Sequence, residues 1–171
     1  MSASKTLNTS EYHAYFQQYI DLVTETTIHA GLQASAEKLL DYYQQLPEEK
    51  HEYRYDTGKW TPKEILLHLI DAERVFCYRA LWFSRMEGSK LEGFDHDAFV
   101  LTSDANARNM TSLLDEFKTT RESTIQLFKG FPAHTLLNEG KANGNPFSVR
   151  ALGYLCCGHV LHHLKVLKSK Y

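Results

Sequence analysis

The chain has 171 residues, with 19 basic and 21 acidic side chains and a formal net charge of -2. This length suits a single domain over residues 1–171 with a sizeable core. The near balance of charge argues against a nucleic-acid or anionic-membrane partner, because either needs a basic surface. The sequence has no run of eighteen apolar residues and no apolar signal segment, so we expect a cytoplasmic protein.

Apolar residues at helical spacing predict two helices near the N-terminus. Residues 9–22 form a short amphipathic segment rich in tyrosine, which suits either the surface of a bundle or a two-fold interface. Residues 27–46 form a longer helix, and Pro47 ends it.

The next helix has the clearest start signal in the chain. Thr61 suits the N-cap, Pro62 suits the first turn, and Glu64 completes a capping box. The apolar pattern then continues to about Met86, with His68 in the centre of the apolar stripe.

The second half of the chain begins with a polar connection over residues 88–103, which we expect to hold no regular element. Ser103 or Asp104 then caps a helix that continues to about Lys129 and ends at Gly130.

Residues 131–147 form a loop with a small hairpin around Asn143, which precedes a glycine. Ser148 then begins a helix that continues to the C-terminus. Four long amphipathic helices without a convincing strand predict an all-α fold, a four-helix bundle with an additional short N-terminal helix.

Histidines interrupt two of the apolar stripes. His159 and His163 lie one turn apart on the inward face of the last helix, and His68 has an inward position on another helix. Because burying an unpaired polar group costs about 1–3 kcal/mol, such positions need a reason. One interpretation is a divalent-metal site, which imidazoles at i and i+4 suit. The other is a set of hydrogen-bonded core histidines without metal.

Other polar residues on or beside these stripes have more than one interpretation each. Cys156, one of three cysteines, is either a free buried thiol or a soft metal ligand on the face of His159. Asp71 either orients a ligand imidazole, acts as an acid in a pocket, or faces solvent. His162 lies about 60° from His159 on the helical wheel, so it flanks the stripe or lines the mouth of a pocket.

Two arginines also have inward positions. Arg79 shares the face of His68, about 16 Å further along the helix, and Arg121 lies at the centre of its own apolar stripe. A buried arginine needs an acceptor, and we expect a structural ion pair with Glu73, Asp71 or Glu116. The alternative is an anchor for a carboxylate or phosphate group of a substrate.

Three segments together resemble the DinB superfamily: residues 53–85 (YRYDTGKWTPKEILLHLIDAERVFCYRALWFSR), 91–100 (LEGFDHDAFV) and 158–167 (GHVLHHLKVL). The resemblance implies a four-helix bundle in which three histidines bind a divalent metal. By their positions in these motifs, the three are His68, His159 and His163.

The resemblance also implies a range of activities. Relatives include metal-dependent transferases that use low-molecular-weight thiols, and metal-dependent hydrolases, so we expect a small-molecule substrate and an open three-histidine site. Zinc or nickel is expected first, and iron or manganese also suits imidazoles. Relatives often form homodimers. The alternative is a non-catalytic bundle in which a structural metal supports binding of a partner or a small molecule.

Overall fold

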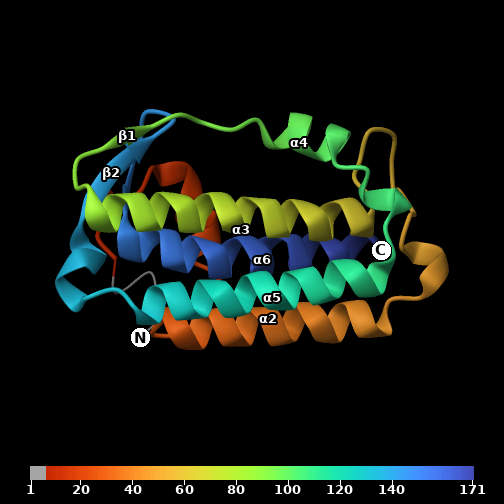
Figure 1. Cartoon of the computed structure of the whole chain (residues 1–171). Coiled ribbons are helices and arrows are strands. Elements are labelled where there is room, and N and C mark those ends of the chain that lie inside the picture. The colour runs from red at the N-terminus through yellow and green to blue at the C-terminus, as the bar shows by residue number, and fades with distance from the viewer. Residues whose placement is uncertain (1–6) are drawn as a thin grey trace.

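The computed structural model describes residues 7–171, and four long helices dominate it (Figure 1). Within the bundle, α2 and α3 both contact α5 and α6, so the four helices enclose one core. This arrangement confirms the predicted four-helix bundle. The four helices are α2 (Ile28–Gln45), α3 (Pro62–Arg85), α5 (Met110–Lys129) and α6 (Val149–Lys170).

The neighbouring helices α3 and α5 run in the same direction (Figure 1). The segment between them therefore extends along the whole bundle, from the end of α3 back to the start of α5. The prediction that it holds no element was wrong, since it forms β1 (Lys90–Leu91) and α4 (His96–Thr102). The Asp95 side chain caps α4 by accepting hydrogen bonds from two backbone N–H groups. Elements of two and seven residues are too short to give a clear periodic signal.

The caps of two long helices match the sequence signals. At α3 the Thr61 side chain accepts from the Glu64 backbone N–H, and the Glu64 carboxylate accepts from the Thr61 backbone N–H. Ser148 caps α6 by accepting from the Ala151 N–H. Both starts are set by residues within one turn, and this is why the sequence predicts them.

The predicted start of α5 at Ser103 or Asp104 was wrong by several residues. Asp104 has a φ of 51°, a left-handed conformation that leads into a 3-10 turn at Ala105–Ala107. The true N-cap is Asn109, whose side chain accepts from the Thr111 N–H.

The hairpin prediction is confirmed. Asn143 and Gly144 both have positive φ, as a type I′ turn requires, and they join β2 (Glu139–Ala142) to β3 (Asn145–Ser148). These strands pair antiparallel, and β1 pairs parallel with β2, so the sheet order is β1-β2-β3. The addition of β1 to the hairpin was not expected from the sequence, and this small sheet lies at the end of the bundle where α3 ends (Figure 1).

The predicted N-terminal helix over residues 9–22 is broken into three short pieces. Two 3-10 turns, Thr9–Glu11 and Ala14–Phe16, precede the single turn of α1 (Gln17–Ile20). The break occurs where Tyr12 forms an isolated antiparallel bridge with Phe147 of β3. Within residues 7–171, no helix is both long and apolar enough to cross a membrane.

Candidate metal centre

Three imidazoles from two helices meet at one point. His68 comes from α3, and His159 and His163 come from α6, which packs against α3. The Nε2 atom of His159 lies 3.1 Å from Nε2 of His68 and 3.1 Å from Nε2 of His163. All three ligand atoms lie within 4.8 Å of one another.

These spacings fit a shared cation better than a hydrogen-bonded cluster. A ring nitrogen carries either one N–H or one lone pair in the ring plane, so Nε2 of His159 can form one linear hydrogen bond, not two. A tetrahedral cation with bonds of about 2.0–2.1 Å places its ligand nitrogens about 3.3 Å apart. The observed 3.1 Å contacts are close to that spacing. The donor set therefore suits a divalent metal ion with an open coordination position.

Aromatic side chains hold the three rings in place. The Trp60 ring centroid lies 4.7 Å from that of His68, and the Trp60 ring stacks on His163 at 16° between planes. Tyr19 and Phe76 meet His159 edge-on, with centroids 5.8 and 5.9 Å away. The three imidazoles therefore lie against aromatic side chains, which restrict the orientations of their rings.

Burial keeps the three imidazoles neutral. It lowers the pKa of His68 to about 4, with a smaller contribution from nearby His96. Burial also holds the pKa of His159 and of His163 well below the usual value, and the neighbouring imidazoles add to the effect. Neutral imidazole is the form that ligates a metal, so all three lone pairs are available at neutral pH.

The cluster forms part of the wall of a cavity of about 530 Å³. This volume is within the range of small-molecule sites. The N-terminal segment, α3, α6, the hairpin and the connection before α4 all contribute to the lining. His162, predicted to flank the stripe, lines this cavity, with its ring centroid 4.9 Å from that of Tyr19.

Arg121 does not reach the cavity. It is 3% exposed and forms two hydrogen bonds with the Glu73 carboxylate, at 2.8 and 2.7 Å. A third and a fourth go to the Leu32 carbonyl and the Ser35 hydroxyl. This is the structural ion pair expected from the sequence, with Glu73 as the partner.

Asp71 also lies outside the cavity lining. Its carboxylate lies 3.7 Å from the Arg74 guanidinium, and it makes no hydrogen bond with His68 in the part of the chain that the structure describes. The geometry therefore gives it no place as a pocket acid or as an orienting group for His68.

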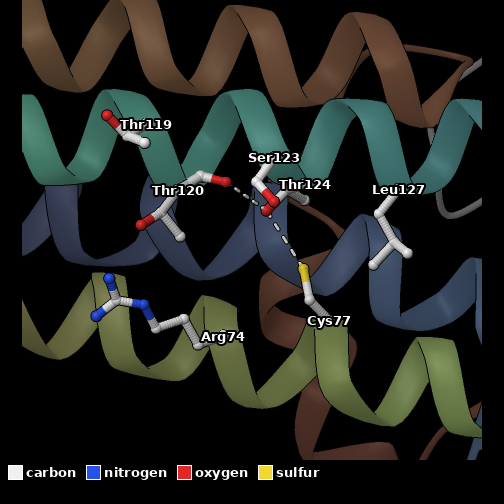
Figure 2. Close-up of a pocket in the computed structure, with 7 residues that line it drawn as sticks. All are labelled: Arg74, Cys77, Thr119, Thr120, Ser123, Thr124 and Leu127. Carbon is white, nitrogen blue, oxygen red and sulfur yellow. Dashed lines mark hydrogen bonds between the residues drawn. The ribbon is translucent and has the colours of Figure 1, made fainter.

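Cys156 faces a different part of the core. A hydrogen bond with the Cys77 thiol and burial both raise its pKa well above the usual value. Cys77 in turn contacts the Thr124 hydroxyl at 3.3 Å, in a groove between α3 and α5 (Figure 2). Cys156 does not line the cavity, so the interpretation as a free buried thiol fits and that as a soft ligand does not.

Two further histidines, which the sequence patterns do not single out, line the cavity. His96 begins α4, and its ring centroid lies 5.7 Å from that of His68. His13 belongs to the N-terminal segment. Neither occupies a periodic apolar stripe, so no helical-wheel signal could have found them.

Comparison with known proteins identifies the family. Residues 32–167 match the DinB superfamily model, so this chain belongs to that superfamily. Among solved structures, the chain is similar to YfiT from Bacillus subtilis, a probable metal-dependent hydrolase with an unusual four-helix bundle topology. The TM-score is 0.75 at 14% identity, over 83% of this chain and 82% of YfiT. A search of curated proteins found no match.

Proposed function

We propose that this protein is a small metal-dependent enzyme whose metal centre is formed by His68, His159 and His163. The observation that carries this proposal is the convergence of three Nε2 atoms, from two helices, on the wall of a ligand-sized cavity. The likeness to YfiT, a probable metal-dependent hydrolase, supports it.

The reaction class follows from the donor set. A divalent cation in this site would act as a Lewis acid and lower the pKa of a water or a thiol in its open position. Zinc or nickel is the first expectation, and iron or manganese also binds imidazoles. The proposed reactions are hydrolysis of a small-molecule substrate and transfer from a low-molecular-weight thiol.

The remaining residues of the cavity have simpler roles. Trp60, Tyr19 and Phe76 exclude water from one side of the cluster. The Tyr19 hydroxyl is protonated at neutral pH, and burial raises its pKa further above the usual value. His96 lies beside His68 outside the ligand set, and we assign it the role of accepting a proton from a substrate group in the cavity.

One observation favours the non-catalytic alternative. Among the described residues that line the cavity there is no aspartate or glutamate, the groups that act as general base in many hydrolases. In that case a structural metal would support a bundle that binds a small molecule without converting it.

An activity panel separates these functions. Untagged protein would be assayed with thiol acceptors and with ester and amide substrates, as prepared, after metal removal and after reconstitution. We expect an activity that needs the metal and disappears in His159→Ala and His163→Ala, and His96→Gln should lower kcat with unchanged metal content. Activity that survives both ligand variants would rule out metal-centred catalysis. Stoichiometric metal with no activity on any substrate would favour the binding function.

A further inference from the structure

One face of α3 forms a wall of the cavity over about three turns of the helix. His68, Ala72, Phe76 and Arg79 occupy successive turns of this face, and all four line the cavity. At a rise of about 1.5 Å per residue, the α-carbons of His68 and Arg79 lie about 16 Å apart. The cavity therefore has a cluster of imidazoles at one end, an apolar floor, and a guanidinium further along.

The Arg79 side chain is buried, at 6% exposure. Its guanidinium forms no hydrogen bond or ion pair with any residue that the structure describes, and burial is the one influence on its pKa. The Cζ atom of its guanidinium lies 5.7 Å from the ring centroid of Phe94, which is a cation–π contact. Arg121 is similarly buried at 3% exposure, but four hydrogen bonds satisfy it.

An unpaired buried cation opposes folding, so its presence needs an explanation. Burial lowers the pKa of Arg79, but a guanidinium remains protonated at neutral pH. The described part of the cavity wall carries no carboxylate that could neutralise it. The other polar groups near the hairpin are the amides of Asn143 and Asn145, which can donate hydrogen bonds to an anion.

We propose that Arg79 binds the anionic group of the substrate, so that the cavity takes a small molecule with a carboxylate or phosphate at one end and its reacting group at the other. The planar guanidinium suits both oxyanions because it can donate two parallel hydrogen bonds. The position of the reacting group depends on the proposed metal function. The anion site depends on Arg79 and not on a metal, so metal-free protein should also bind the anion.

Isothermal titration calorimetry with matched probes tests this site. Chelator-treated protein would be titrated with hexanoate, with hexyl phosphate and with the neutral hexanamide. A charge-assisted hydrogen bond predicts that at least one anion binds about ten- to a hundredfold more tightly than the amide. Arg79→Gln should abolish this preference, and Arg79→Lys should retain part of it. Arg85→Gln, on the exposed side of the same helix, should leave it unchanged.

The comparison of hexanoate with hexyl phosphate identifies which oxyanion the site prefers. Wild-type protein that binds neither anion more tightly than hexanamide would overturn the proposal, as would a preference that survives Arg79→Gln. An anion preference seen only in metal-loaded protein would place the anion on the metal and also overturn it.

A thermal melt separates ligand binding from a structural role. Arg79→Gln removes no hydrogen bond or ion pair with a described residue, so it should lower Tm little or raise it, whereas Arg121→Gln should lower Tm by several degrees. An equal loss of Tm in both variants would show that Arg79 is structural and would overturn the proposal. Failure of the protein to bind metal would refute the proposed function without affecting the anion preference.

Discussion

His159 is the central ligand of the candidate metal centre, and its removal gives the sharpest test in solution. Its Nε2 atom lies 3.1 Å from the Nε2 atoms of both other histidines. With zinc at a hundred times its dissociation constant, the metal should stabilise the folded chain by about 2.7 kcal/mol. Since 1 kcal/mol shifts Tm by about 2–4 °C at this chain length, the expected rise is about 5–11 °C.

The measurement is a thermal melt of untagged protein with a chelator and with excess zinc. His159→Ala leaves two imidazoles and should lose most of the zinc-dependent rise. His134→Ala removes an exposed histidine outside the cluster and should keep the full rise. A wild-type Tm that zinc does not change, or an equal rise in His159→Ala, would refute the metal assignment.

Three further predictions concern stability. Arg121→Met leaves the Glu73 carboxylate buried without its partner, and it should lower the free energy of unfolding in urea by about 3–5 kcal/mol. Replacing both residues by methionine should lower it much less. Equal losses in the single and the double variant would contradict the pairing. Gly158→Ala would place a Cβ atom 2.2 Å from a backbone carbonyl of α1 and should cost about 1–3 kcal/mol, whereas Gly130→Ala, with 3.4 Å to its nearest atom, should change little. Burial holds the pKa of His68 at about 4 in the folded chain, against about 6.5 when unfolded. The unfolded chain therefore binds more protons between these values, and His68 alone should cost metal-free protein up to about 3 kcal/mol as the pH falls from about 6.5 to 4. The lowered pKa of His159 and of His163 adds to this loss, and a pH-independent stability over that range would contradict the assigned environment.

Local signals explain what the sequence predicted well. The capping box of Thr61 and Glu64 and the cap at Ser148 act within one turn, so neighbouring residues alone determine where α3 and α6 begin. The turn at Asn143 and Gly144 is equally local. The three clustered histidines were found because they interrupt apolar stripes and match the motifs of a known family.

Tertiary contacts explain what the sequence did not predict. The pairing of β1 with β2 joins residues about fifty positions apart, and each strand alone is too short to give a signal. His96 lies in the segment that joins α3 to α5. It lines the cavity because this segment extends back along the bundle. Arg79 and Arg121 have similar places on their apolar stripes. Only the folded chain shows that Glu73 pairs with Arg121 and that no residue within 7–171 pairs with Arg79.

The central claim is that one divalent ion joins the two helices through three imidazoles. Anomalous diffraction from crystals of untagged protein, measured at the zinc, nickel, iron and manganese edges, tests it most directly. We expect a single peak about 2.0–2.2 Å from Nε2 of His68, His159 and His163, and the edge at which it appears identifies the ion. Crystals grown with each metal in excess that show no peak among these nitrogens would contradict the claim.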